Sequence, residues 1–347
     1  MALPTSGPLT LDQIHIEAGG SSGTLCSLND ADIRGIINKS VNASNAFSDY
    51  RGQSAETSLP TGGSQINGQV QLKEITASSY ISSGGTLRIP STMWVWSDST
   101  STAALTIDIP CTIINDGKII GKGGVGGHGN TVISNSSSNA KGNGGDGGLA
   151  IKINSSVSGV TITNSSGAFI AGGGGGGGSS GVEPQNSYAG GGGGAGGGSG
   201  GSGGGVGTGN VGGTGGVLNA TGGQHVGNPI TSAPGGQAGG FGMGSSGEDQ
   251  RSGGGGGGGR ILPGSSSSSN TFYVQGGNGG NAGSNGGSGG NSGKAGGGGG
   301  WGASGGNGYR AAFGTNDCQG GGGGKAVEDS GNSYTLSNSG TIYGATT

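Results

Sequence analysis

Apolar residues recur at helical spacing in a short stretch near the N-terminus. Leu11, Ile14 and Ala18 share one face of a helix, and a pair of glycines follows them. Thr10 precedes the stretch as a candidate cap, and Gln13 stands three residues later, as in a capping box. The pattern predicts a helix that begins after Thr10 and ends before the glycines.

A second apolar stripe follows within the first fifty residues. Ile33, Ile36 and Ile37 lie on one helical face, with Asn29 or Asp30 as the cap. Each helix has only about three turns, and a segment of this size buries little apolar surface by itself. We therefore expect residues 1–52 to dock on another protein. A small independent capping domain is the alternative.

The hydrophobic period changes to two after a polar linker at residues 53–68. Between residues 69 and 121 apolar positions alternate with polar ones, which predicts a small β-domain. These positions are Val70, Leu72, Leu87, Ile89, Met93, Val95, Leu105, Ile107 and Ile109. Trp94 and Trp96 lie on the same side of one strand, and we expect them to pack in the core or between domains.

One pattern occurs three times, at residues 111–121, 161–172 and 335–344. Each copy reads Thr, apolar, any residue and Asn, then one or two polar residues and Gly, and ends in a short apolar stretch and Gly. Two short strands around an Asn-containing turn would produce it. We expect the chain to return repeatedly to one layer of strands, and to end near the place where its glycine-rich part begins.

Glycine dominates the remainder, from about residue 121 to 324. The chain has 98 glycines in 347 residues, and from Gly287 to Gly308 every third residue is glycine. Three residues per turn is the period of an extended helix without internal hydrogen bonds, whose glycine faces let neighbouring backbones bond laterally. The sequence therefore predicts a bundle of polyglycine-II helices, or glycine-rich sandwich, within residues 122–347. Flexible Gly/Ser linkers are the alternative.

Composition excludes several classes of function. Hydrophobic residues make up 28% and charged residues 9%, with a net charge of -3, so we expect neither a large enzyme core nor a nucleic-acid partner. Nine prolines are too few for collagen. The N-terminus has no signal-peptide pattern, and no apolar run is long enough to span a membrane.

Candidate catalytic and metal-binding groups are scattered. The histidines and cysteines lie far apart and match neither a zinc spacing nor a nucleophile arrangement. They are His15, His128, His225, Cys26, Cys111 and Cys318. We therefore expect no enzyme activity, no metal and no cofactor.

Chemically varied segments separate the glycine runs, and these segments hold the candidate binding residues. Loops held by a rigid scaffold are common binding sites, and aromatic and arginine side chains are frequent anchors. The candidates are Tyr188, His225, Phe272, Tyr273, Tyr309, Arg310 and Phe313. The alternative is that these aromatic side chains cover the glycine bundle. Trp301 lies inside a glycine tract, where we expect it to pack at the bundle edge.

Two parts of the chain resemble proteins of tailed bacteriophages. LPTSGPLTLDQIHIEAGG, SLNDADIRGIINK and FSDYRG, all within residues 1–52, resemble the N-terminal segment of tail-tip and minor tail proteins. That resemblance implies attachment to other phage tail proteins. The glycine-rich part resembles the distal tail-fibre adhesins of T-even-like phages, in which polyglycine-II helices present variable loops to a receptor on the host surface.

The β-domain at 69–121 is not a feature of those adhesins, so a homotrimer and a monomer both remain open. The combined interpretation is an adhesin of the virion tail tip or tail fibre, made in the host cytoplasm, that binds a protein or glycan receptor. A structural spacer or tip plug without a receptor is the main alternative. A depolymerase that cuts surface polysaccharide is a third.

Overall fold

The computed structural model describes most of the chain outside the glycine-rich loops. The described residues are 3–37, 39–52, 56–60, 65–66, 69–128, 142–182, 187–198, 241–243, 250–252, 279–289, 295–310 and 315–347. Side chains are not described at residues 65, 66, 69, 180–182, 187–189, 241–243, 250–252, 309, 310 and 315–317.

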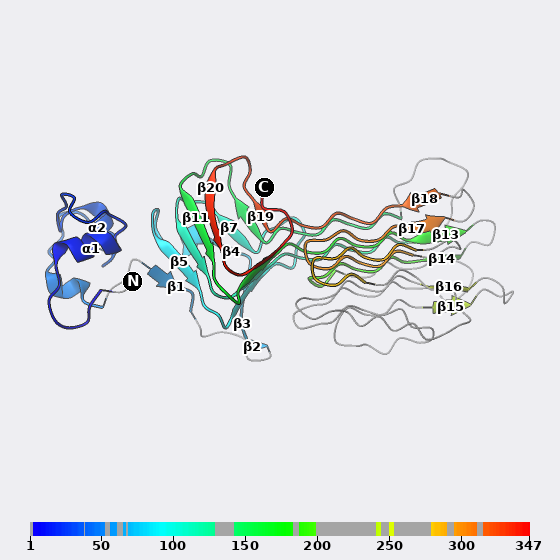
Figure 1. Ribbon diagram of the computed structural model, residues 1–347, viewed down its shortest axis with the longest axis horizontal. Coiled ribbons are helices and arrows are strands. Elements are labelled where there is room, and N and C mark those ends of the chain that lie inside the picture. The colour runs from blue at the N-terminus through cyan, green and yellow to red at the C-terminus, as the bar shows by residue number, and fades with distance from the viewer. Residues whose placement is uncertain are drawn as a thin grey trace.

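Residues 3–52 form a small helical unit, drawn in blue in Figure 1. Its elements are α1 (Leu11–Glu17), α2 (Ala31–Gly35) and the 3-10 helix η1 (Phe47–Tyr50). Its core contains the buried side chains of Leu3, Ile14, Ile33, Ile36 and Tyr50. The Gly52 N–H donates to the Pro4 carbonyl at 3.3 Å, so the two ends of the unit meet.

The capping box predicted for the first helix is confirmed. The Gln13 N–H donates to Thr10 Oγ1 at 3.2 Å, and the Thr10 N–H donates to Gln13 Oε1 at 2.8 Å. Asp30 occupies the N-cap position of α2, but its carboxylate accepts from the Ser27 N–H and makes no cap bond. Both helices, with 7 and 5 residues, are shorter than expected.

Three sheets surround the main core, and their neighbouring strands are parallel except for β2 and β3. Sheet A consists of β1 (Glu56–Ser58), β5 (Thr86–Ile89), β8 (Thr112–Asn115), β11 (Val160–Asn164) and β20 (Tyr334–Asn338). Sheet B consists of β2 (Gln65–Ile66), β3 (Gln69–Lys73), β6 (Met93–Trp96), β9 (Lys118–Ile120), β12 (Phe169–Ala171) and β21 (Thr341–Tyr343). Sheet C consists of β4 (Ile75–Thr76), β7 (Leu105–Ile107), β10 (Ile151–Ile153) and β19 (Val327–Glu328), and η2 (Ala77–Ser79) follows β4.

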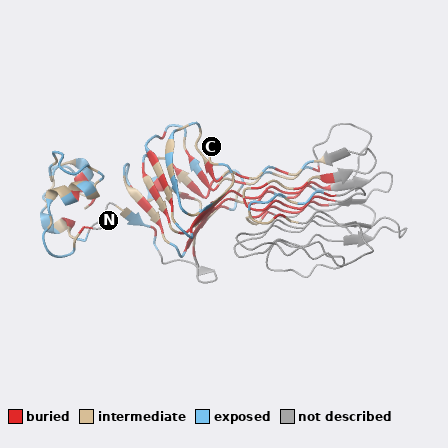
Figure 2. Cartoon of the chain, in the orientation of Figure 1, coloured by how far each residue is buried: buried red, intermediate tan, exposed pale blue. Residues whose placement is uncertain are grey.

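The order of these strands along the chain is that of a three-sided parallel β-solenoid. The chain visits sheets A, B and C in turn, in the rungs β1-β3-β4, β5-β6-β7, β8-β9-β10 and β11-β12-β19, and ends with β20 and β21. The strands of one rung therefore lie in different sheets, and within each sheet the strands of neighbouring rungs pair with each other. Figure 2 shows buried residues at alternating positions of these strands, which is the pattern expected where one face of each strand meets a core.

The three sequence repeats are three successive rungs. Thr112, Thr161 and Thr335 are paired in register, and so are Asn115, Asn164 and Asn338. The expectation that the chain returns to one strand layer is confirmed. However, the two strands within each copy do not pair with each other, because one belongs to sheet A and the next to sheet B.

The domain limits drawn from the sequence differ from the fold in two places. Strands β1 and β2 lie inside the expected linker at 53–68, and β1 pairs with β5. Six strands beyond residue 121, namely β10, β11, β12, β19, β20 and β21, complete the solenoid that begins in the expected β-domain. Composition assigned these six strands to the glycine-rich part because each is short and long glycine-rich segments interrupt the series, between β9 and β10 and between β12 and β19.

Both long glycine-rich excursions leave the solenoid after a strand of sheet B and return before a strand of sheet C. The first lies between β9 and β10, and the second lies between β12 and β19. Figure 1 shows the described glycine segments running side by side away from the solenoid. At their far end lie β13 (Ser180–Val182), β14 (Ser187–Ala189), β15 (Phe241–Met243), β16 (Gln250–Ser252), β17 (Gly308–Arg310) and β18 (Thr315–Cys318).

Hydrogen bonds between the glycine segments follow a period of three. In order along the chain, the N–H groups of residues 173–179 donate to the carbonyls of Gly148, Ala195, Ala303, Gly145, Gly192, Gly306 and Gly142. The carbonyls of residues 173–178 accept from the N–H groups of Gly324, Gly124, Gly299, Gly321, Gly127 and Gly296. All these bonds are 2.7–2.9 Å long. Segment 172–179 thus donates to three neighbouring segments and accepts from three others.

Candidate binding surface

The far end of the glycine segments carries a sheet of four short strands in the order β14-β13-β17-β18. Gly181 of β13 is paired with Tyr188 of β14 on one side and with Arg310 of β17 on the other. Since neighbouring strands lie about 4.8 Å apart, the backbones of Tyr188 and Arg310 are roughly 10 Å apart. Tyr309 precedes Arg310 on the same strand. The fold therefore brings three of the seven predicted binding residues to one small sheet.

The other four predicted residues lie outside the described part of the chain. They are His225, Phe272, Tyr273 and Phe313. The side chains of Tyr188, Tyr309 and Arg310 are not described either, so their predicted binding role stays a prediction.

The base of this sheet is fixed by contacts that the sequence did not suggest. The Ser179 N–H donates to the Gly142 carbonyl at 2.7 Å, and Ser179 Oγ donates to Cys318 Sγ at 3.7 Å. Ser179 is buried, and Cys318 is half-buried. Ser179 directly follows a glycine run, and Cys318 is the last residue of β18. Their positions at these ends are the only feature of the sequence that indicates their role.

Asn and Asp side chains replace backbone carbonyls at the boundary of the glycine segments. Asp146 Oδ1 accepts from the Gly322 N–H at 2.7 Å, and Asn307 Oδ1 accepts from the Gly320 N–H at 3.0 Å. Asn143 and Asn285 make the same kind of bond to the N–H groups of Gln319 and Ser304. These bonds pair peripheral donors for which no further glycine segment is available among the described residues.

An aromatic cluster joins the solenoid to the turns of the glycine segments. Trp94 and Phe169, on the outer side of sheet B, make an edge-to-face contact with ring centroids 5.5 Å apart. The Lys118 ammonium lies 4.6 Å from the centroid of the Trp94 ring. Trp301, from a glycine-segment turn, is fully buried against this cluster. The packing roles expected for Trp94 and Trp301 are confirmed.

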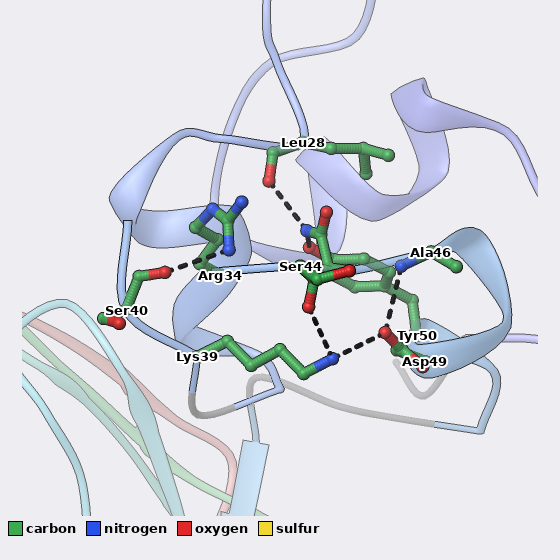
Figure 3. A network of polar contacts seen from close by, with 9 residues as sticks. Leu28, Arg34, Lys39, Ser40, Ser44, Ala46, Asp49 and Tyr50 are labelled. Atoms are coloured by element: carbon green, nitrogen blue, oxygen red, sulfur yellow. Dashed lines mark hydrogen bonds and ion pairs between the residues drawn. The ribbon is translucent and has the colours of Figure 1, made fainter. Parts of the chain in front are cut away.

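The helical unit is tied together by the polar network in Figure 3. Lys39 Nζ donates to the Ser44 carbonyl at 2.9 Å and to Asp49 Oδ2 at 2.8 Å. The hydrogen bond from Lys39, followed by that from the Ala46 N–H, holds the pKa of the Asp49 carboxyl below its usual value. Arg34, which is buried, donates from Nη1 to the Ser40 carbonyl at 2.9 Å. The connections between the helices are therefore held in place by side chains.

Exposed apolar side chains concentrate on this helical unit. Among the described residues, the large hydrophobic side chains that are exposed are Ile16, Leu25, Val41, Phe47 and Val125. The first four belong to residues 3–52, and Leu25 is fully exposed. This small unit therefore carries four of the five exposed large hydrophobic side chains of the described residues.

The described ranges contain no group of three or more histidine, cysteine, aspartate or glutamate residues that could hold a metal ion. No described helix has the length and apolar character needed to cross a membrane.

Comparisons with known proteins give one structural likeness. No protein-family model matches the chain, and no curated protein matches it. The chain is similar to the gp37-gp38 adhesin tip complex of the bacteriophage S16 long tail fibre, with 18% identity and a TM-score of 0.34. The match covers 99% of this chain and 100% of the other. A TM-score at this level does not establish a shared fold.

Proposed function

We propose that the chain is an adhesin of a bacteriophage tail fibre or tail tip, and that it binds a receptor on the host surface. The observation that carries the proposal is the hydrogen-bonded array of glycine segments, whose far end gathers β13, β14, β17 and β18. A stiff array with loops at one end is suited to present binding residues at a distance from an attachment point. Binding by loops needs no reaction and no cofactor.

The array itself is proposed to be a polyglycine-II lattice. Each residue from 173 to 179 donates to a different neighbour from the residue before it, and the neighbours recur after three residues. A helix of three residues per turn produces this order, because its N–H groups point in three directions. The close approach of the segments supports the same assignment. An added Cβ at Gly173 or Gly176 would lie 1.8 Å from a backbone oxygen, so these positions have room for glycine alone.

Residues 1–52 are proposed to attach the adhesin to other phage tail proteins, which would place it in the virion. The exposed apolar side chains of Ile16, Leu25, Val41 and Phe47 support this role, since apolar surface in a small folded unit is commonly a contact surface. A mass measurement on the chain bound to those tail proteins would give the number of copies in the assembly. Both a monomer and a homotrimer fit the proposal.

The experiment exchanges residues 179–189, 260–275 and 309–319 for the corresponding segments of a relative with another host. Binding of the purified protein to cells of both hosts is then measured. The proposal expects binding to follow the exchanged segments. A matched control exchanges residues 98–102, an exposed connection between β6 and β7 of the solenoid, and should leave binding unchanged.

Two other outcomes would each replace the proposal. Unchanged host preference in all exchanged proteins would favour a spacer or tip plug without a receptor. Release of new sugar ends from host polysaccharide would favour a depolymerase.

A further inference from the structure

We propose that the open end of the solenoid, formed by β20 and β21, binds a strand-turn-strand segment of another polypeptide with an Asn opposite Asn338. This surface belongs to the solenoid and is separate from the proposed receptor-binding loops. The proposal goes beyond the adhesin role and does not depend on it.

The core is partly uncovered at this end rung. In sheet A the inward row consists of Leu87, Ile113, Ile162 and Leu336, and the first three are 0% exposed. Leu336 is only half-buried. In sheet B the inward row consists of Leu72, Val95, Ile119, Ile170 and Ile342, and only its two end residues, Leu72 and Ile342, are half-buried. Apolar residues on the two strands of an added rung would cover Leu336 and Ile342.

Backbone groups are also left for pairing at this end. Among the described strands, β20 pairs with β11 alone and β21 pairs with β12 alone, so each has a free edge. A free edge presents N–H and carbonyl groups that an extended peptide can pair with. Sheet C differs, because the Ala326 and Val327 N–H groups both donate to the Ala345 carbonyl and Tyr334 donates to the Thr346 carbonyl. The opening is therefore limited to sheets A and B.

The stacked asparagines define what the partner must offer. Asn115 Nδ2 donates to Asn164 Oδ1 at 2.8 Å, and Asn164 Nδ2 donates to Asn338 Oδ1 at 2.8 Å. Each of these amides also donates to a carbonyl of the next rung, at Phe169 or Thr341. Asn338 continues the series, but its Nδ2 has no acceptor among the described residues, and the side chain is exposed. A further rung with an Asn at this position would accept the bond.

The required chemistry favours a different polypeptide over a second copy of this chain. A twofold pair would place β20 antiparallel to its equivalent, whereas the rungs of sheet A pair in parallel. Head-to-tail stacking would place the β1 end of another copy on β20. At that end the residue in the asparagine row is Leu59, because Ser58 is paired with Arg88 and Leu59 follows it. Neither arrangement continues the parallel row of asparagines.

The test uses the full chain and a fluorescent peptide with the sequence of residues 160–172, which already forms such a rung within this fold. Saturable binding is expected, with a Kd between about 10 µM and 1 mM, because the peptide must be ordered as it binds. A peptide with Asn164→Leu should bind about tenfold more weakly, since it lacks one hydrogen-bond acceptor.

Two variants of the protein locate the site. Leu336→Lys puts a charge on the uncovered core position and should abolish peptide binding. Ser337→Lys changes the neighbouring residue, which lies in the outward row of β20, and should bind the peptide as the unmodified protein does. Thermal melting checks that both variants keep the solenoid.

Three results would overturn the proposal. They are no saturable binding up to about 1 mM, undiminished binding by the folded Leu336→Lys variant, and a dimer in sedimentation that Leu336→Lys dissociates. The last result would assign the open end to a second copy of the chain. Cell binding, measured in parallel, reports on the receptor-binding loops and separates the two proposals.

Discussion

The substitution Gly176→Ala tests the close packing of the glycine segments directly. The new Cβ would lie 1.8 Å from the Val125 oxygen and 2.4 Å from its carbonyl carbon. Ordinary contact between such atoms is about 3.5 Å, so the two segments would have to separate by roughly 1.5 Å. Gly176 also donates to Gly145 and accepts from Gly321, and the shift would weaken both hydrogen bonds.

The expected loss of stability is several kilocalories per mole. Overpacking costs about 1–3 kcal/mol, and each buried backbone group left unpaired costs about 1–3 kcal/mol more. Alanine reduces the entropy of the unfolded chain, which returns about 0.4–1 kcal/mol. The net effect is a loss of about 2–5 kcal/mol, or a decrease in Tm of roughly 5–15 °C for a cooperative unit of this size.

Gly322→Ala is the matched control. Gly322 lies in a neighbouring glycine segment, but an added Cβ there would meet only the Asp146 side chain, at 3.4 Å. Its Tm should equal that of the unmodified protein or exceed it by about 2 °C. Scanning calorimetry measures both. If Gly176→Ala has the same Tm as the control, the segments are not packed backbone against backbone, and the argument for a stiff scaffold is wrong.

Four smaller predictions follow from other described residues. Asn164→Leu should lower the free energy of unfolding in urea by about 2–3 kcal/mol, whereas Asn338→Leu at the exposed end should cost less than about 1 kcal/mol; equal losses would contradict the buried asparagine stack. Burial raises the pKa of the Cys111 thiol to about 11, so iodoacetamide at pH 8 should label it only after unfolding, and rapid labelling of the folded protein would be inconsistent with that burial. The pKa of Asp12 is lowered by hydrogen bonds from the Gly23 N–H and then from Ser22, so Asp12 stabilises the fold above about pH 4, and this contribution disappears as the pH falls through its folded pKa. A carboxyl titration by NMR should give a midpoint below that of a peptide aspartate. A higher midpoint would refute the contact. Trp301→Phe should lower the free energy of unfolding in urea by less than Trp301→Ala. The buried indole N–H has no hydrogen-bond partner, so its loss leaves nothing unpaired, whereas the alanine variant leaves a cavity that costs about 3–5 kcal/mol. Equal losses would count against the packed cluster.

Local patterns in the sequence predicted the local structure well. The capping box at Thr10, the apolar stripe through Ile33, and the packing of Trp94 each depend on residues close together in the chain. In all these positions the residue type and its spacing state the geometry.

The solenoid could be inferred only in part. The repeat at residues 111–121, 161–172 and 335–344 indicated a shared strand layer, but the pattern is equally consistent with hairpins. The structure separates the two because β8 and β9 belong to different sheets. Side chains that pair peripheral backbone donors, such as Asp146, could not be found at all, because their partners are 176 positions away in the chain.

The corner between sheets B and C varies in length from one rung to the next, while the sheets keep their register. Glu74 alone joins β3 to β4 there, residues 97–104 join β6 to β7, and the two glycine-rich excursions take the same exit from later rungs. Insertions of very different length are therefore accommodated at this one corner while the solenoid itself stays unchanged. The whole glycine-rich part could therefore be exchanged by cutting the chain at four places, near residues 121, 150, 172 and 326, without redesigning the solenoid.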